Sequence, residues 1–320
     1  MTQKTDFRRL MGRLRLRHLA LLDWLGRDPN LGRAAKNLHM TQPTASKLLR
    51  EIEDMFETPL FSRNRRGLTP TAAGNVLTRR ACIMLSEMQA THTELLAALK
   101  GSTGHVRIGV FPVAIPEFMP KLHLALHQSS PGLTMELREA VEHQLLDQLS
   151  KGEIDCIFGR IVMENLTPDL RHQTLYDEPT VIVSGIGHPA LTHNATARLQ
   201  VLAQTAWMLP ARQGAVYNLV ASRLATLGLP APRVEIETTS VFVTIEMLNH
   251  TKLLSVLPLK VARSYEAAHK VAIVPVEALK SSYPFGVIYR ADAASNPLLK
   301  TLMDVSSQVS TEAKNENVIK

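Results

Sequence analysis

A chain of 320 residues is long enough for two or three domains, and its hydrophobic fraction of 45% is ordinary for a globular protein. It contains no run of 18 apolar residues and no apolar segment at its basic N-terminus. We therefore expect no membrane span and no secretory signal, and we place the protein in the cytoplasm. The two cysteines, Cys82 and Cys156, form no CxxC pair, which suits a reducing compartment.

The positive charge of the chain is concentrated in its first third. Residues 1–100 hold 17 Lys and Arg against 9 Asp and Glu, whereas the other 220 residues hold 19 against 20. A basic segment joined to a near-neutral body predicts a polyanionic partner for the first segment only. A solvated basic surface is the alternative that charge alone leaves open.

Two short helices are predicted first in chain order. Leucines recur at helical spacing from Leu16 to Leu25, and Asp28-Pro29-Asn30 ends that helix. The second helix is expected over Leu31–Leu38, where Ala34-Ala35 permits close packing against a neighbour.

A third helix is predicted from Gln42 to Phe56, with Thr41 as its N-cap and Pro43 in the first turn, where a missing N–H is tolerated. The side chains expected to be buried are Ala45, Leu48, Leu49, Ile52 and Phe56. A polar face lies opposite, and its amide, hydroxyl and cationic groups can donate hydrogen bonds to base edges and phosphates. This face comprises Gln42, Ser46, Lys47 and Arg50.

A hairpin with a basic loop is predicted after Pro59. The apolar residues Leu60, Phe61 and Leu68 flank a cationic tip, Arg63-Asn64-Arg65-Arg66-Gly67. Three arginines in a loop can serve solubility alone. Because this loop follows three short helices with a polar recognition face, we favour contact with DNA.

These motifs together resemble the LysR-type transcriptional regulators. The resemblance follows Ala34-Ala35, Thr41-Gln42-Pro43, Ser46-Lys47, Ile52-Glu53, Leu60-Phe61-Ser62-Arg63, Leu68-Thr69 and Ala73-Gly74, in an unbroken order. It implies a winged helix-turn-helix whose third helix enters the major groove of double-stranded DNA. Lys47 stands where the family more often has arginine, and lysine lacks the bidentate fork. By position, the resemblance puts Gln42, Pro43, Thr44, Ser46 and Lys47 at the DNA, with Arg63, Arg65 and Arg66 on flanking phosphates.

One long helix is predicted over residues 70–100, starting at Thr69-Pro70. A heptad-like seam runs along it through Leu77, Ala81, Met84, Met88, Thr91, Leu95 and Ala98. About 30 helical residues span roughly 45 Å, too far to be covered by the small domain alone. We expect the same helix of a second subunit as partner, through Leu77, Met84, Met88 and Leu95. Packing of the stripe on its own chain is the alternative.

From residue 104 onward, short β-rich runs alternate with helical runs. Strands are expected at residues 106–110, 134–139, 154–158, 180–184, 207–209, 233–238, 253–257, 271–274 and 286–289. Helices are expected at residues 116–127, 143–151, 216–227 and 241–249 and after Pro297. The alternation predicts α/β subdomains with largely parallel sheets.

The family resemblance extends more loosely over this region, through Val106–Gly109, Leu145–Leu149, Gly152–Asp155 and Gly187–Pro189. It implies an effector-binding domain like the periplasmic solute-binding proteins, with two halves, two crossover strands and the ligand between them. It also implies a homotetramer built as a dimer of dimers. The domains expected are residues 1–69 for DNA binding, 70–100 for the linker helix and 101–320 for the effector, with half I at about 104–163 and 270–320 and half II at about 174–265.

Ligands of open α/β sheets bind beyond the carboxyl ends of strands, where helix N-termini present N–H groups. Applied to this chain, the rule and the family's contact positions select Phe111, Pro112, Val113, Ala114, Ile115, Val141, Arg160, Pro210, Arg212, Gln213, Ser240 and Phe242. Two arginines from different halves favour a small organic anion over a neutral sugar. Surface ion pairs of these arginines with residues such as Asp155 or Glu153 are the alternative.

No catalytic motif is recognised in the chain. A P-loop, HExxH and GxSxG are absent from the sequence, and His123 and His127 lack a third metal ligand nearby. We therefore expect no cofactor, no metal and no enzyme activity. The alternatives are an α/β ligand-binding enzyme with an appended DNA-binding domain, and an architectural DNA protein, for which over 200 near-neutral residues would be unnecessary. RNA polymerase is a further candidate partner of a regulator.

Overall fold

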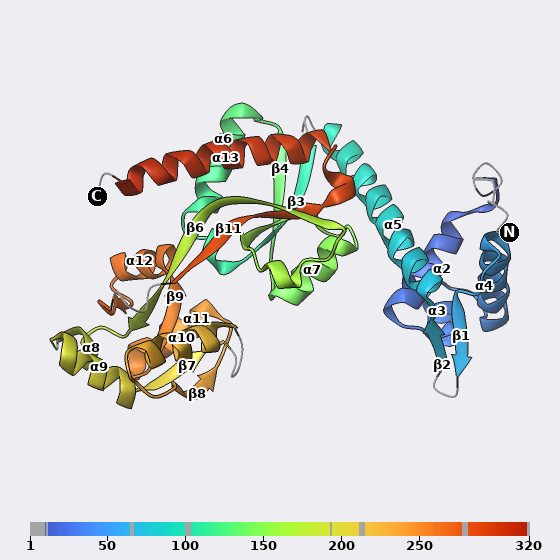
Figure 1. Cartoon of the computed structure of the whole chain (residues 1–320). Helices are drawn as coiled ribbons and strands as arrows, with labels where there is room; N and C mark the ends of the chain where they lie inside the picture. Colours follow the sequence, from blue (N-terminus) through green and yellow to red (C-terminus); the bar gives the residue numbers. More distant parts are fainter. Residues whose placement is uncertain are drawn as a thin grey trace. The chain divides into compact units, whose positions relative to one another are not determined.

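A computed structural model describes residues 10, 12–64, 67–99, 104–192, 194–210, 215–276 and 281–318. The chain divides into two compact units, one comprising residues 1–105 with 146–155 and the other residues 106–145 with 156–320. Figure 1 shows the first as a small group of helices with one hairpin and the second as a sheet with helices around it. We call them the N-terminal and C-terminal units.

Three helices form the body of the N-terminal unit: α2 (Leu16–Arg27), α3 (Leu31–Asn37) and α4 (Gln42–Phe56). Local side chains cap two of them. The side-chain oxygen of Asn30 accepts a hydrogen bond from the backbone N of Arg33 at 3.0 Å, and that of Thr41 accepts one from the backbone N of Thr44 at 3.3 Å. The bounds predicted for α4 and its cap are confirmed.

The apolar side chains of these helices meet in one core. Ala45, Leu48, Leu49 and Ile52 are buried as predicted, whereas Phe56 is half-buried and Met55 takes its place in the core. The prediction for Phe56 was wrong because the last turn of α4 buries the i+3 neighbour of Ile52 rather than the i+4 neighbour. From α2 and α3 the core receives Leu19, Leu21, Leu22, Leu25, Leu31, Ala34 and Ala35.

The predicted hairpin consists of β1 (Phe61–Asn64) and β2 (Gly67–Pro70), paired antiparallel with Phe61 opposite Pro70. The long helix α5 (Ala72–Ala98) begins after it. The expectation that Thr69-Pro70 opens this helix was wrong. Pro70 ends a strand, and Thr71 provides the cap by accepting a hydrogen bond from Gly74 N at 3.0 Å.

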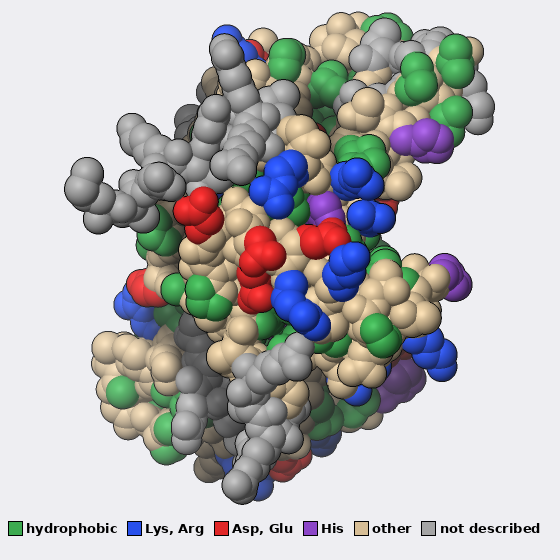
Figure 2. Space-filling model, turned by 90° about the vertical axis from the view of Figure 1, so that its right-hand side faces the viewer, with side chains coloured by type: hydrophobic (Ala, Val, Ile, Leu, Met, Phe, Trp, Pro, Cys, Tyr) green, Lys and Arg blue, Asp and Glu red, His purple; other side chains and the backbone are tan. Residues whose placement is uncertain are grey.

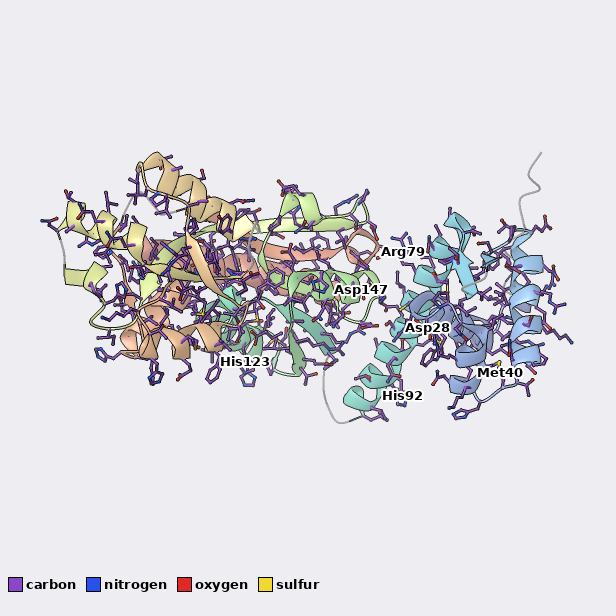
Figure 3. The ribbon with its side chains drawn as sticks, turned by 90° about the horizontal axis from the view of Figure 1, so that it is seen from below. Asp28, Met40, Arg79, His92, His123 and Asp147 are labelled. Atoms are coloured by element: carbon purple, nitrogen blue, oxygen red, sulfur yellow. The ribbon has the colours of Figure 1, made fainter. Side chains whose placement is uncertain are left out.

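The first half of α5 packs on the N-terminal unit, and the second half is exposed. Thr78, Ala81 and Cys82 are buried against this core. Gly74 lies so close to the hairpin that a side-chain carbon there would come within 2.1 Å of the carbonyl oxygen of Leu60. Farther along, His92 is exposed, and Figure 3 labels it on α5 beyond Arg79.

One sheet runs through the C-terminal unit in the order β4-β3-β5-β11-β6-β9-β7-β8, with β10 paired to β6. The strands are β3 (Gly104–Val110), β4 (Leu133–Glu139), β5 (Cys156–Arg160), β6 (Leu170–Ser184), β7 (Ala206–Leu209), β8 (Arg233–Glu237), β9 (Leu254–Pro258), β10 (Ala272–Ile273) and β11 (Ser281–Arg290).

The two longest strands, β6 and β11, cross between the two ends of this sheet. They pair antiparallel with each other, and each also pairs antiparallel with a further strand, β6 with β9 and β11 with β5. Parallel pairs occur at the two ends, between β3 and β5 and between β7 and its neighbours β8 and β9. The expectation of largely parallel sheets was therefore incomplete: it missed the antiparallel centre.

Helices cover both faces of the sheet (Figure 1). They are α6 (Phe118–Ser129), α7 (Glu142–Ser150), α8 (Pro189–Thr192), α9 (Ala195–Gln204), α10 (Ala215–Thr226), α11 (Val241–His250), α12 (Leu259–Ala267) and α13 (Pro297–Val318). Short 3-10 turns lie at Pro112–Ala114, Met163–Asn165 and Ala291–Ala293. Neither α9 nor α12 was predicted, because their polar residues hide the helical periodicity.

Separate cores hold the two ends of the sheet. Near β5 and β11, the Phe118 ring lies 5.2 Å from that of Phe158 and 5.1 Å from that of Phe285. At the other end, Trp207 and Met208 of β7 are fully buried on opposite faces, each in a core of its own. Among the described residues, no helix is long and apolar enough to cross a bilayer.

Candidate functional site

The exposed face of α4 carries the predicted polar row. Gln42, Pro43 and Thr44 are exposed in its first turn, and Lys47 and Arg50 are exposed farther along, while Ser46 is half-buried. In Figure 2, Lys and Arg side chains lie beside acidic ones rather than in one continuous field. The candidate nucleic-acid surface is therefore defined by the exposed polar row on α4, and not by net charge.

Hydrogen bonds fix parts of this surface. The hydroxyl groups of Thr41 and Thr44 are 2.8 Å apart, and Arg50 Nη2 donates to Ser46 Oγ at 3.5 Å. Glu53, which the sequence analysis named only as part of the family motif, ties α4 to the hairpin. Its Oε1 accepts a hydrogen bond from the backbone N of Leu60 at 2.8 Å and from that of Phe61 at 3.2 Å. This carboxylate sets where the hairpin lies relative to α4.

The predicted cations of the hairpin are only partly described. Arg63 belongs to β1, whereas Arg65 and Arg66 lie outside the described residues. The seam of α5 is divided between two environments. Leu77 packs on the N-terminal core, whereas the residues Met84, Met88 and Leu95 are 46%, 47% and 59% exposed.

A cavity of about 500 Å³ opens in the C-terminal unit. Such a volume suits a small organic molecule. Seven of the predicted effector residues line it: Phe111, Pro112, Val113, Val141, Arg160, Pro210 and Ser240. Gly159 makes room for the aromatic wall, because a side-chain carbon there would lie 2.0 Å from the Phe111 ring.

Three predicted residues are not part of this wall. Ala114 is fully buried in the core, and Ile115 and Phe242 are exposed outside the cavity. Other residues of the same strand-end segments do line the cavity, because neighbouring side chains of a segment point in different directions. Arg212 and Gln213 lie outside the described residues.

Sequence reasoning missed the side chains that the crossover strands contribute. Glu178 and Thr180 come from β6, and Tyr283 and Phe285 come from β11. The strand expected at 180–184 began too late to include Glu178, and the one expected at 286–289 began beyond Tyr283. Further lining comes from Glu139, Ala140, Glu142, Val216, Leu219, Thr238, Thr239, Val241, Thr244, Ser255, Val256, Leu257 and Pro258.

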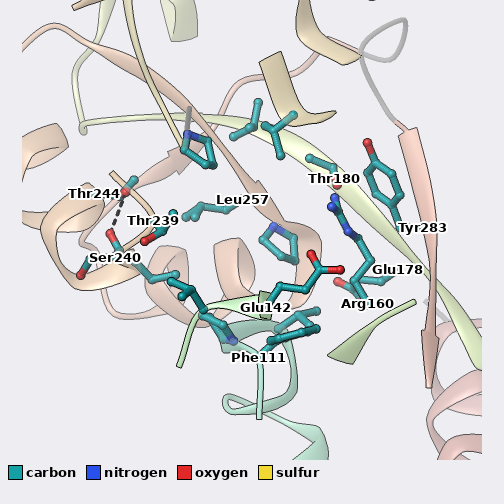
Figure 4. Close-up of a pocket in the computed structure, with 18 of the residues that line it drawn as sticks. Phe111, Glu142, Arg160, Glu178, Thr180, Thr239, Ser240, Thr244, Leu257 and Tyr283 are labelled. Atoms are coloured by element: carbon teal, nitrogen blue, oxygen red, sulfur yellow. Dashed lines mark hydrogen bonds between the residues drawn. The ribbon is translucent and has the colours of Figure 1, made fainter. Parts of the chain in front are cut away.

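Strand register brings the polar groups of the wall together. Phe285 of β11 lies opposite Arg160 of β5 on one side and opposite Tyr176 of β6 on the other, and Tyr283 lies opposite Glu178. Since side chains two residues apart share a face, all five project from the same side of the sheet. The Arg160 guanidinium carbon lies 4.3 Å from the centroid of the Tyr283 ring (Figure 4).

Glu178 is the most buried of the described acidic residues that line the cavity, with only 5% of the residue exposed. Its Oε1 accepts a hydrogen bond from the backbone N of Lys260 at 2.9 Å, while its Oε2 has no hydrogen-bond partner among the described residues. Burial raises the pKa of Glu178 above the ordinary glutamate value, and Glu117 raises it further. The Lys260 N–H and the charges of Lys260 and Arg263 oppose the shift.

Lys260 is occupied by other groups. Its Nζ lies 4.1 Å from the centroid of the Tyr176 ring and 3.5 Å from Glu117 Oε2. Glu117 also pairs with Lys121 at 3.2 Å. Among the described lining residues, the cavity therefore presents one arginine against three carboxyl groups, those of Glu139, Glu142 and Glu178.

Hydroxyl groups line the opposite wall, around the start of α11. Ser240 caps this helix, accepting from Val243 N at 3.3 Å, and Thr244 Oγ1 donates to the carbonyl oxygen of Ser240 at 3.0 Å (Figure 4). The described residues include no cluster of three or more groups that could hold a metal ion. The chemistry of the cavity is thus recognition by charge, hydrogen bonds and aromatic contact.

A helical unit with an exposed polar helix and an α/β unit with a ligand-sized cavity together define a DNA-binding regulator with a sensor domain. Comparison with known proteins agrees. Residues 16–75 match the family described as "Bacterial regulatory helix-turn-helix protein, lysR family", and residues 99–310 match the "LysR substrate binding domain". The chain belongs to the LysR family of transcriptional regulators, which confirms the family and the fold class predicted from the sequence.

Relatives extend along most of the chain. The HTH-type transcriptional regulator GbpR of Azospirillum brasilense is 28% identical over 294 residues, 92% of this chain and 86% of the relative. The DNA-binding transcriptional dual regulator OxyR of Escherichia coli (strain K12) is 34% identical over 178 residues, 55% of this chain and 57% of OxyR. The solved structure of CbnR, a LysR family transcriptional regulator, shares the fold with a TM-score of 0.62 at 18% identity, covering 93% of this chain and 99% of that one.

The raised pKa of Glu178 predicts a pH-dependent loss of stability. Below the ordinary pKa of glutamate the group is neutral in both states. Between that value and the raised pKa of the folded state, the unfolded chain releases its proton while the folded chain keeps it, so stability falls as pH rises. Glu178→Gln should unfold at a higher temperature than the wild type at pH 8, and the difference should shrink toward pH 5.

Differential scanning fluorimetry of the ligand-free protein across this pH range is the measurement. Asp177→Asn is the matched control, because Asp177 is the exposed neighbour of Glu178 on β6. A difference between Glu178→Gln and wild type that is equal at pH 5 and pH 8 would contradict the predicted pH dependence.

Proposed function

We propose that this LysR-family regulator acts in the cytoplasm, reads specific double-stranded DNA through α4 and the hairpin, and responds to a small organic anion bound in the cavity of the C-terminal unit. The observation that carries the anion is Arg160. Its guanidinium lines the cavity above Tyr283 and has no ion pair with a described acidic residue. The surface ion pairs considered as an alternative for Arg160 are thus not favoured.

The DNA proposal rests on the exposed row of α4. An amide at Gln42 can contact adenine with two hydrogen bonds, and Lys47 and Arg50 carry the cations that phosphates require. CbnR, whose structure has been solved as a complex with its target DNA, has a similar fold, with a TM-score of 0.60 at 20% identity over 93% of this chain and all of that chain. We propose that this chain binds its DNA in the same manner as CbnR.

Gln42→Ala should weaken binding to the specific site by about 1–3 kcal/mol, because a base contact is lost, and should change binding to random DNA little. The specific site is obtained by selection from random oligonucleotides, and fluorescence anisotropy gives both affinities. Gln89→Ala, an exposed glutamine on α5, is the control. Equal losses on specific and random DNA would remove Gln42 from base reading.

We further propose that α5 pairs with the same helix of a second subunit and that these dimers assemble into tetramers. The apolar side chains of Met84, Met88 and Leu95 are about half-exposed or more on its second half. A two-fold assembly would recognise inverted half-sites spaced by multiples of about 10 base pairs. Contact of the bound regulator with RNA polymerase is a further prediction.

The double substitution Met84→Asp/Met88→Asp should dissociate this dimer, because four carboxylates would face one another in the pair. Sedimentation velocity measures the mass, and anisotropy measures the loss of DNA affinity. Ser86→Asp/Gln89→Asp adds the same charge away from this face of α5 and should leave the mass unchanged. An unchanged mass and DNA affinity for the methionine variant would mean that the seam is not the interface.

An enzyme is not favoured, because the family and the named relatives are transcriptional regulators. Peroxide sensing, suggested by relatives named hydrogen peroxide-inducible genes activator, is not favoured either. Cys82 and Cys156 are buried, and burial raises the pKa of the Cys82 thiol to about 12. A thiol that stays protonated and inaccessible is a poor target for oxidation.

Arg160→Met should weaken the binding of any acid that occupies the cavity by about 10- to 100-fold, since a charge-assisted hydrogen bond is lost. Calorimetry with a panel of aliphatic and aromatic acids tests this, together with the effect of each acid on DNA affinity. Arg138→Met, an arginine of β4 that pairs with Glu136 outside the cavity, is the control. Unaltered acid affinity in Arg160→Met would refute the anion site and leave the regulator assignment intact.

A further inference from the structure

Of the residues that line the cavity, Glu178 has a buried side-chain oxygen without a hydrogen-bond partner in the described part of the chain. A buried polar atom of this kind is unfavourable unless something supplies the missing bond. The protein itself satisfies only Oε1, through the backbone N of Lys260. The wall of the cavity thus presents an acceptor that a bound molecule can satisfy.

Arg160 and Glu178 line the same part of the cavity, so one small molecule can contact both. They belong to β5 and β6, with β11 between them, and neighbouring strands are about 4.8 Å apart. Arg160 extends over Tyr283, which is the cross-strand partner of Glu178. The guanidinium and the carboxyl group therefore flank the same aromatic ring.

The charge balance of the cavity limits what can bind there. Among the described lining residues, Glu139, Glu142 and Glu178 carry carboxyl groups and Arg160 is the cation. Lys260, which is not a lining residue, is held by Glu117 and the Tyr176 ring. A ligand with one carboxylate can pair with Arg160. A second carboxylate on the same ligand would approach like charges in a partly dry site, which is unfavourable.

We propose that the effector is a small monocarboxylic acid that also carries a hydrogen-bond donor, a hydroxyl or an ammonium group, with its carboxylate on Arg160 and its donor on Glu178 Oε2. This inference rests on the proposed organic anion and narrows its class. It excludes plain carboxylic acids and dicarboxylic acids as the preferred ligands. Hydroxy acids and amino acids share the required chemistry.

The test uses matched probes that differ at one position. One set is 3-phenylpropionate, 3-phenyllactate, phenylalanine and benzylmalonate, and the other is butyrate, 2-hydroxybutyrate, 2-aminobutyrate and ethylmalonate. Calorimetry on the full-length protein should show, in at least one set, that a donor-bearing acid binds at least about tenfold tighter than both the plain acid and the malonate.

Substitutions at Glu178 separate the two donors. Glu178→Met removes the acceptor and should abolish the advantage of both donor-bearing acids. Glu178→Gln offers an amide, which serves a hydroxyl group but not an ammonium group. A hydroxy-acid effector should therefore lose less than about threefold in affinity, and an amino-acid effector at least about tenfold. Asp177→Asn is the control, and thermal unfolding confirms that each variant is folded.

Several outcomes would overturn the inference. The proposed role of Glu178 as acceptor is refuted if a plain acid or a malonate binds as tightly as its donor-bearing counterpart. It is also refuted if Glu178→Met still binds donor-bearing acids more tightly than plain acids. Acid binding that still depends on Arg160 would then leave the proposed function standing. Failure of every acid to bind also rejects the inference. Binding of a neutral sugar such as galactose that changes DNA affinity would reject the organic anion itself.

Discussion

The cavity depends on the antiparallel pairing of β6 with β11. This pairing fixes Tyr283 opposite Glu178 and Phe285 opposite Tyr176, and the pairing of β11 with β5 adds Arg160 in register. The Tyr176 and Phe285 rings stack with centroids 4.6 Å apart, so the same face that presents charge to the cavity is anchored in the core beneath it. Strand pairing thus brings residues more than 100 positions apart in the sequence into one wall of the cavity.

A buried carboxyl group in this wall opposes the stability of the unit. Glu178 is buried and has one hydrogen bond within the described part of the chain, and the Lys260 ammonium group contacts Glu117 and the Tyr176 ring. An apolar residue of similar size would pack there without the desolvation penalty. Functional sites often retain such locally unfavourable groups, because the missing interaction is supplied by the ligand.

The sequence predicts the N-terminal unit better than the cavity, and the reason is physical. In α4, a cap at Thr41 and a regular apolar period act locally, so both ends of the helix follow from neighbouring residues. In β6 and β11 the pattern is interrupted by Pro179 and Pro284, which argue against a paired strand when only the sequence is seen. Long-range pairing overrides that local preference. Glu178 and Tyr283 were missed because they adjoin these prolines.

The position of the cavity also explains how occupancy can become a signal. One wall belongs to β5, β6 and β11, and the opposite wall belongs to the segment from Thr238 to Thr244 at the start of α11. The two crossover strands are continuous between the ends of the sheet, and the proposed response to the effector is a change in the spacing of these ends. A ligand that contacts both walls binds best at one spacing, and it therefore shifts the population toward that spacing. Arg160 and Glu178 both belong to the first wall, so a ligand that touched these two groups alone would bind every spacing equally and would carry no signal.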